Sequence, residues 1–231
     1  MTLLHHHDRI EGDLVIEVAF TDVSLSLGDA AADDVRDEAL RQVAEATMAT
    51  PVLMHQVHGA DAALVAGRDA GGPDTCDALY TSQPEVALLA RAADCVPVLL
   101  ADPDTGWIAA VHCGRPGLAA GVVPATIAAV RDAGGHPKVA WMGPHVCGAC
   151  YEVPVQLQEQ VGAIVPASRS TTSWGTPALD LGAGVRAQLA AAGITDVRVV
   201  DVCTREDPSW PSYRRDGAAA TRFAGAIWSH P

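Results

Sequence analysis

The feature that most constrains this chain is a pair of apolar segments separated by a short turn. Residues 96–101 read Val-Pro-Val-Leu-Leu-Ala, and residues 107–111 read Trp-Ile-Ala-Ala-Val. Uninterrupted apolar runs of this length predict strands buried on both faces, and the Asp-Pro-Asp-Thr-Gly sequence between them predicts a turn. A hairpin returns the chain to its starting edge. Cys95, before the first strand, and His112, after the second, are therefore predicted to lie close together.

A third residue, His58, completes a set of side chains with a common chemistry. Thiolate and imidazole are preferred ligands of zinc, and three protein ligands leave the fourth tetrahedral position open to a substrate. The same three residues can instead form a cysteine nucleophile with a histidine base. Their spacing, 37 residues and then 17 residues, matches no local zinc motif. Spacing alone therefore also allows three unrelated core or surface residues.

The composition narrows the class of protein. The 231 residues carry a formal net charge of −13, and 49% are hydrophobic. This charge argues against a general binder of nucleic acid or of an anionic membrane, so any phosphate site must be a local basic pocket. There is neither an N-terminal signal core nor an 18-residue apolar run, so a soluble cytoplasmic protein is expected. The six cysteines do not form a disulfide framework in a chain of this length.

The order of predicted elements favours an α+β fold rather than a strict βαβ alternation. We expect one compact domain over residues 1–231, with mixed β-sheets flanked by helices, and an exposed loop over residues 67–77. A proline at position 124 should kink or divide the helix predicted over residues 117–133. The remaining predicted helices span residues 33–49, 155–164 and 182–192, and the remaining strands span residues 14–20, 139–142, 197–202 and 223–228.

Several motifs occur in the order typical of one family. They are Gln56-Val57-His58-Gly59, Asp77-Ala78-Leu79, Ala93-Asp94-Cys95-Val96-Pro97, Ala109-Ala110-Val111-His112, Gly143-Pro144, Cys150-Tyr151-Glu152-Val153, Leu179-Asp180-Leu181, Cys203-Thr204 and Ser212-Tyr213-Arg214-Arg215-Asp216-Gly217. With them the chain resembles the bacterial laccase-domain family over nearly its whole length. That family is also named polyphenol oxidase, peptidoglycan editing factor and purine nucleoside phosphorylase. The resemblance implies metal ligands at His58, Cys95 and His112.

The function that this resemblance implies is zinc-dependent phosphorolysis of purine nucleosides, with adenosine deamination as an additional activity. The partners would be a small-molecule nucleoside and phosphate, and Arg115, Arg214 and Arg215 are the candidate phosphate ligands. One alternative is a Cys-His hydrolase that edits peptidoglycan precursors, in which zinc on the thiolate would block the nucleophile. Others are copper-dependent phenol oxidation, although a multicopper centre needs many histidines, and an inactive binding protein. The oligomeric state stays open.

The chain departs from the family pattern in two places. The family usually continues its second histidine as His-Ala-Gly-Trp-Arg-Gly, whereas this chain reads His112-Cys113-Gly114-Arg115-Pro116-Gly117. A Thr-Arg-x-Gly-Gly-Val-Ser stretch, which usually precedes a Ser-Leu-Asn-Leu-Gly motif, is missing before Ser24. Both changes remove or shift an arginine that could contact an anion. They therefore predict an altered anion site.

Three short segments invite other interpretations. Cys147-Gly148-Ala149-Cys150 has redox or zinc spacing, but no second pair completes a four-cysteine site, and we interpret it as a structural turn near the pocket. His5-His6-His7 is assigned no function. Trp228-Ser229-His230-Pro231 matches the start of a streptavidin-affinity tag, so both ends are candidates for flexible or tag-derived segments.

Overall fold

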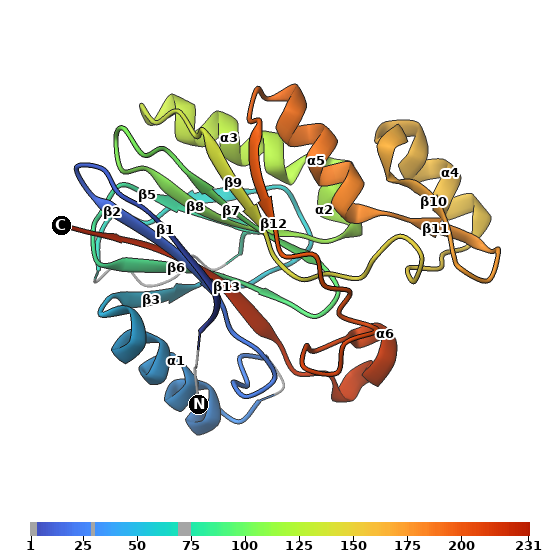
Figure 1. The fold of residues 1–231 in the computed structure, drawn as a ribbon, viewed down its shortest axis with the longest axis horizontal. Helices are drawn as coiled ribbons and strands as arrows, with labels where there is room; N and C mark the ends of the chain where they lie inside the picture. Colours follow the sequence, from blue (N-terminus) through green and yellow to red (C-terminus); the bar gives the residue numbers. More distant parts are fainter. Residues whose placement is uncertain (1–3, 29–30, 69–74) are drawn as a thin grey trace.

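Two mixed β-sheets pack face to face in the computed structural model, which describes residues 4–28, 31–68 and 75–231 (Figure 1). The five-stranded sheet has the order β1 (His5–Ile10), β2 (Val15–Phe20), β13 (Phe223–His230), β6 (Val86–Ala92), β3 (Thr50–Leu53). The six-stranded sheet has the order β12 (Asp196–Val199), β9 (Val139–Met142), β7 (Val96–Ala101), β8 (Ile108–Cys113), β5 (Ala78–Thr81), β4 (Ala62–Leu64). A two-stranded sheet joins β10 (Arg169–Thr171) to β11 (Pro177–Leu179).

Helices cover the outer faces of the two large sheets (Figure 1). The helices are α1 (Asp33–Thr47), α2 (Arg115–Ala120), α3 (Val122–Asp132), α4 (Val155–Ile164), α5 (Leu181–Ala191) and α6 (Tyr213–Asp216), with short 3₁₀ turns at Pro166–Ser168 and Gly217–Ala219. Helix α1 packs on the five-stranded sheet, α2, α3 and α5 cover the six-stranded sheet, and α4 packs on the two-stranded sheet of β10 and β11. The α+β fold in one compact domain is therefore confirmed.

The hairpin of β7 and β8 lies inside the six-stranded sheet, and both of its faces are buried. Val98 and Leu100 point to the helices, whereas Leu99 and Ala101 point to the five-stranded sheet. Such a strand needs apolar residues on both faces, which explains the uninterrupted run in the sequence. The predicted hairpin is confirmed, with Pro97 of β7 opposite His112 of β8.

The segment predicted as one helix over residues 117–133 is two helices. The break lies at Gly121, whose φ of 81° is in the left-handed region, and not at Pro124. Pro124 is the third residue of α3, in the first turn, where a backbone N–H has no intrahelical partner to lose. A glycine adopts the required φ without strain, so the division falls three residues earlier than predicted.

Two other boundaries differ from the expectation. The strand predicted over residues 197–202 ends at Val199: the Val200 amide still donates to Met142, the last residue of β9, and the Val202 amide then donates back to the Val200 carbonyl in a turn. In the loop predicted over residues 67–77, residues 69–74 lie outside the described residues. The prediction of an exposed loop is wrong for the end of this segment, because Cys76 and Asp77 are buried. The Asp77 carboxylate accepts hydrogen bonds inside the protein, as described below.

The two terminal segments, with His5-His6-His7 and Trp228-Ser229-His230, lie in paired strands. β1 pairs with β2, and β13 lies between β2 and β6 in the middle of its sheet. Trp228 is 3% exposed, and His230 Nε2 lies 2.7 Å from Glu17 Oε1. His7 also contacts the Glu17 carboxylate. These segments therefore contribute to the five-stranded sheet.

Among the described residues, none of the helices combines the length and the apolar composition that crossing a membrane requires.

Candidate active site

The β7–β8 hairpin brings Cys95 and His112 to one edge of the six-stranded sheet. Cys95 directly precedes β7, and His112 is the fifth residue of β8. Side chains alternate along a strand, and Ile108 and Ala110 face the five-stranded sheet. His112 therefore points to the space between the sheets, where it is 3% exposed. The local geometry expected from the sequence is present.

Asp77 brings the distant His58 segment to the same edge. This buried carboxylate accepts hydrogen bonds from three successive backbone amides: Val57 at 3.2 Å, His58 at 2.9 Å and Gly59 at 2.6 Å. The hydrogen bonds hold the pKa of Asp77 below its usual range although burial alone would raise it, and the bond from His112 makes the largest lowering contribution. An ionised buried carboxylate with this many donors is satisfied.

Asp77 also orients His112. Its Oδ1 lies 2.8 Å from His112 Nδ1, and its carbonyl accepts the His112 backbone amide at 2.8 Å. A proton on Nδ1 that is donated to this carboxylate leaves Nε2 free to bind a metal ion. Carboxylate–histidine pairs of this kind are the usual outer support of a metal-binding histidine. One buried residue thus positions two of the three predicted ligands.

The ligand atoms of His58, Cys95 and His112 all lie within 4.8 Å of one another. Cys95 Sγ is 3.8 Å from His58 Nε2, and the two imidazole rings stand nearly perpendicular with centroids 4.8 Å apart. Two nitrogens and one sulfur converging in this way fit a metal ion, with His58 exposed and Cys95 half-buried so that one side stays open. The structure therefore brings together all three residues that the sequence predicted as ligands.

Without a cation, Cys95 and His112 polarise one another. Burial alone would raise the pKa of Cys95, but the charge of His112 and hydrogen bonds to both histidines lower it to about 6. Burial alone would lower the pKa of His112, but the Cys95 charge and the Asp77 hydrogen bond raise it to about 9. The thiolate is the form of a cysteine that can act as a nucleophile or bind a metal ion. The site thus favours the reactive form of the cysteine near neutral pH.

The backbone beside the ligands is held in an uncommon conformation. His58 has a φ of 61° and Asp94 a φ of 88°, both in the left-handed region. Asp94 is fixed there by its side chain, which accepts from Thr204 Oγ1 at 2.7 Å and from the Arg214 backbone amide at 2.6 Å. Such strain persists only where surrounding contacts enforce it. Asp94 therefore sets the position from which Cys95 enters the site.

Gly114 leaves room for the side chains of His58 and Cys95 to approach one another. A Cβ atom at this position would lie 2.6 Å from His58 Cδ2 and 3.0 Å from Cys95 Sγ. Real side chains do not reach such contacts, so any larger residue would displace a ligand. The Cys113-Gly114 sequence after His112 thus serves the site through the absence of a side chain.

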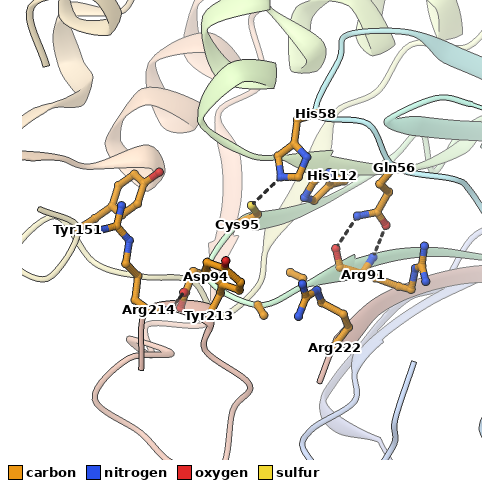
Figure 2. Close-up of a pocket in the computed structure, with 12 residues that line it drawn as sticks. Gln56, His58, Arg91, Asp94, Cys95, His112, Tyr151, Tyr213, Arg214 and Arg222 are labelled. Carbon is orange, nitrogen blue, oxygen red and sulfur yellow. Dashed lines mark hydrogen bonds between the residues drawn. The ribbon is translucent and has the colours of Figure 1, made fainter. Parts of the chain in front are cut away.

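The three predicted ligands line a cavity of about 530 Å³, shown in Figure 2. Tyr151, Tyr213 and Arg214 line one side of this pocket, and Gln56, Arg91 and Arg222 line the other (Figure 2). Small-molecule sites commonly have this size and combine apolar walls with a few polar groups. The pocket therefore places cationic and aromatic side chains around one metal-capable centre.

The predicted phosphate ligands fall in different places. Arg214 lines the pocket, with its guanidinium carbon 4.4 Å from the ring centroid of Tyr151. Arg215 turns away and donates to the carbonyls of Thr204 and Trp210 and to the Asp216 carboxylate. Arg115 is the first residue of α2 and is not among the residues that line the pocket.

Sequence reasoning assigned no role to several residues that shape this site. Arg222 lines the pocket, with one nitrogen donating to the carbonyls of Ala220 and Thr221 at 2.8 Å. Arg91 is 5% exposed, and its guanidinium donates to the Leu27 and Met54 carbonyls. These hydrogen bonds connect the pocket wall to both segments. Asp77 was visible in a family motif, but a single acidic residue after a Gly- and Pro-rich segment carries no sign of burial.

The fold and this site define a class: α+β proteins with two packed mixed sheets and a Cys-His₂ centre at the edge of one of them. The sequence profile of the family described as multi-copper polyphenol oxidoreductase laccase matches residues 8–230. The chain belongs to this laccase-like family.

The relatives and solved structures extend this match to nearly the whole chain. The chain is 48% identical to a purine nucleoside phosphorylase of Streptomyces coelicolor over 212 residues, which cover 88% of this chain and 87% of that protein. It is 46% identical to a purine nucleoside phosphorylase of Streptomyces griseus, with 88% and 86% covered. The crystal structure of YlmD from Geobacillus stearothermophilus superposes with a TM-score of 0.83 at 26% identity, covering 94% of this chain and 92% of that one.

Proposed function

We propose that this protein is a purine nucleoside phosphorylase whose active centre is a zinc ion held by His58, Cys95 and His112. The observation that carries this proposal is the convergence of these three ligands at a pocket lined by Arg214 and Arg222. The names of the relatives supply the substrate class. A zinc ion in this position would provide a Lewis acid at the wall of the pocket.

Zinc is proposed rather than copper because of the donor set. Zinc takes thiolate and imidazole ligands, and three protein ligands with an open fourth position are the arrangement of its catalytic sites. A multicopper cluster requires many more histidines. Within the described residues, two groups can hold a metal ion, and only the group at the pocket contains histidine. This observation favours a single-metal centre over oxidase chemistry.

The residues of the chain would divide the work of phosphorolysis between them. In this reaction a phosphate oxygen bonds to the anomeric carbon of the ribose while the bond to the base breaks. Arg214 and Arg222 are proposed to bind the phosphate, since guanidinium groups match its charge and geometry. Tyr151 and Tyr213 provide aromatic surfaces of the kind on which a base can stack. Asp77 keeps His112 in one orientation throughout.

Arg115 and Arg215 stay predicted phosphate ligands, but the structure favours Arg214 over both. The side chain of Arg215 is committed to two carbonyls and a carboxylate, so binding phosphate would break contacts that hold the segment in place. Arg115 lies at the start of a six-residue helix. We propose that the exposed side chain of Arg214 takes over most of the anion contact from both.

The direct test is the phosphate-dependent release of base from inosine and adenosine. Wild-type protein should release base only when inorganic phosphate is present, and Cys95→Ala should not. Arg214→Ala should raise the KM for phosphate, with Arg41→Ala on the exposed face of α1 as the matched control. Base release without phosphate, or full activity in Cys95→Ala, would contradict the proposal.

Adenosine deamination is proposed as an additional activity of the same centre. The open position beside three zinc ligands suits activation of water, which hydrolysis of the exocyclic amine requires. Ammonia release from adenosine in phosphate-free buffer measures this activity separately. Loss of ammonia release and of phosphorolysis together in Cys95→Ala would support one shared centre.

A cysteine hydrolase is the second candidate function, and one geometric observation favours it. Cys95, His112 and Asp77 form a chain of thiol, imidazole and buried carboxylate, with His112 Nδ1 2.8 Å from Asp77 Oδ1. This is the order of nucleophile, base and orienting acid in cysteine and serine hydrolases. Metal content separates the two functions. Metal-free protein that is fully active and is inactivated by alkylation of Cys95 would favour the hydrolase.

A further inference from the structure

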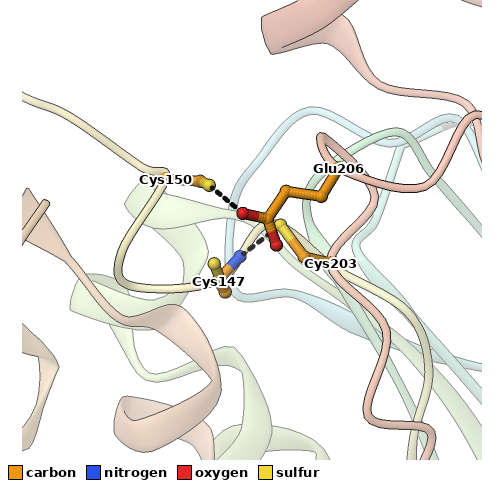
Figure 3. Close-up of side chains that lie close together, drawn as sticks. All are labelled: Cys147, Cys150, Cys203 and Glu206. Carbon is orange, nitrogen blue, oxygen red and sulfur yellow. Dashed lines mark hydrogen bonds between the residues drawn. The ribbon is translucent and has the colours of Figure 1, made fainter. Parts of the chain in front are cut away.

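A second group of metal-capable side chains lies outside the pocket. It consists of Cys147, Cys150, Cys203 and Glu206, whose ligand atoms all lie within 4.8 Å of one another (Figure 3). None of these residues lines the pocket at the first centre. The mechanism proposed above uses none of them. The sequence suggested only a structural turn at Cys147-Gly148-Ala149-Cys150, because the partners of this pair are more than 50 residues away.

The four residues come from two turns of the same design. In the first, the Cys150 amide donates to the Cys147 carbonyl at 3.0 Å; in the second, the Glu206 amide donates to the Cys203 carbonyl at 3.1 Å. Each turn therefore presents two ligands three residues apart. Spacing of this kind, C-x-x-C or its equivalent, is typical of structural zinc sites.

The fold holds the two turns together independently of any ion. They follow β9 and β12, which are neighbouring parallel strands, so both turns leave the same edge of the sheet. The Cys147 amide lies 3.4 Å from Cys203 Sγ, and the Thr204 amide donates to the His145 carbonyl at 3.1 Å. Gly148 packs the first turn closely against the rest of the fold, because a Cβ there would lie 2.7 Å from both Asp180 Cβ and Ser170 Oγ.

From this arrangement we propose that Cys147, Cys150, Cys203 and Glu206 bind a structural zinc ion, distinct from the ion at the pocket. A tetrahedral zinc with bonds of about 2.3 Å to sulfur needs sulfurs about 3.8 Å apart. The four ligand atoms lie within 4.8 Å of one another, so small side-chain shifts would bring the sulfurs to this spacing. Three protein sulfurs and one carboxylate would fill all four positions, which is the closed arrangement of a structural site.

The chemistry of the donors selects zinc among the common ions. Thiolates exclude calcium and magnesium, which take oxygen ligands, and favour zinc, copper(I) or iron. The carboxylate of Glu206, 3.4 Å from Cys150 Sγ, favours zinc over the softer copper(I). The six cysteines are free thiols in the structure, so no disulfide competes for these sulfurs.

A zinc ion at this second group should fix the position of the pocket wall that contains Tyr151. Tyr151 directly follows Cys150, and its ring lies beneath the Arg214 guanidinium. A zinc ion bridging the two turns would tie the Tyr151 segment to residues 203–206. Removing this ion should therefore reduce stability first and activity only indirectly.

The test is zinc stoichiometry in protein whose first centre has been removed. Cys95→Ala should retain one zinc per chain after dialysis against buffer containing a weak chelator, and Cys95→Ala/Cys203→Ser should retain none. Cobalt loading of Cys95→Ala should give the strong near-ultraviolet absorption of several thiolate–cobalt bonds. The site needs no phosphorylase activity, so this experiment separates its outcome from that of the proposed function.

A matched pair of variants separates loss of zinc binding from loss of the fold. In the Cys95→Ala background, Glu206→Gln keeps the fold but should weaken zinc binding at least tenfold, whereas Glu159→Gln, at an exposed position on α4, should not. Cys95→Ala protein with no zinc and three reactive thiols at these positions would overturn the proposal. A disulfide within the group in freshly purified protein, found by mass spectrometry before and after reduction, would also overturn it.

Discussion

The two metal-capable groups of this protein are built in opposite ways. At the pocket, His58, Cys95 and His112 come from separate segments, and a buried carboxylate, Asp77, holds two of them in place. At the second group, two short turns each supply two candidate ligands, and hydrogen bonds within and between the turns hold them together. The first arrangement leaves one side open to a cavity, and the second offers four side chains, enough to fill a tetrahedral metal site. An open coordination position suits a reaction, whereas a filled one suits a structural ion.

The two groups also differ in the strain of their backbone. In the pocket group His58 has a positive φ, and so does Asp94, which directly precedes Cys95. None of the four residues of the second group is among the described residues with a positive φ. Strained backbone concentrates at functional sites because it keeps side chains in positions that relaxed backbone would not give them. This contrast supports a reaction at the pocket and a stabilising role for the second group.

Removing one cysteine from each group should separate these roles most clearly. Cys95→Ala is expected to lower kcat/KM for phosphorolysis by about 10³-fold, since a metal centre contributes several kcal/mol to the transition state. Cys203→Ser is expected to leave kcat/KM within about threefold but to lower the melting temperature. Steady-state assays and thermal unfolding of both variants check this. Equal loss of activity in both would end the distinction between the groups.

The reactivity of the thiols in metal-free protein gives the next largest difference. The pKa of Cys95 is lowered to about 6, whereas burial and hydrogen bonds to Cys203 and Cys150 raise the pKa of Cys147 to about 12. At pH 7 Cys95 is therefore a thiolate and Cys147 a thiol. Iodoacetamide should modify Cys95 about 10²-fold faster. Its rate should fall as the pH drops below about 6, which peptide mass spectrometry can follow.

Asp77 has no counterpart in the second group, so its removal tests how the pocket group is held. Asp77→Asn should weaken metal binding at the pocket by about 10- to 100-fold, because His112 loses its orienting carboxylate. Competition with a chelator measures this affinity. Asp104→Asn, at an exposed ion pair with Lys138, is the control and should change nothing. A metal affinity unchanged in Asp77→Asn would show that the ligands are positioned by other contacts.

Two glycines allow matched steric tests of the two groups. Gly114→Ala places a methyl group against His58 and Cys95, and Gly148→Ala places one against Asp180. The first should lower activity about tenfold, and the second should instead lower the melting temperature by about 3 °C. Gly67→Ala is the control, since nothing lies within 4 Å of its added carbon. The opposite assignment of effects would contradict the roles given to the two groups.

Much of this protein is determined by its sequence alone. The apolar runs on both sides of residues 102–106 specified a hairpin buried on both faces, and this hairpin brings Cys95 and His112 together. The local pattern was sufficient because register and turn act over few residues. The boundaries of α4 were predicted correctly for the same reason.

Only the tertiary structure decided the remaining features. His58 reaches the site through Asp77, which precedes β5, and β5 pairs with β8. The second group exists because β9 and β12 lie side by side although more than 50 residues separate them. Contacts of this kind depend on which strands become neighbours, and no local spacing records that choice. The sequence is therefore sufficient to identify the candidate site residues. Whether their side chains come close together depends on which strands are neighbours in the folded sheets.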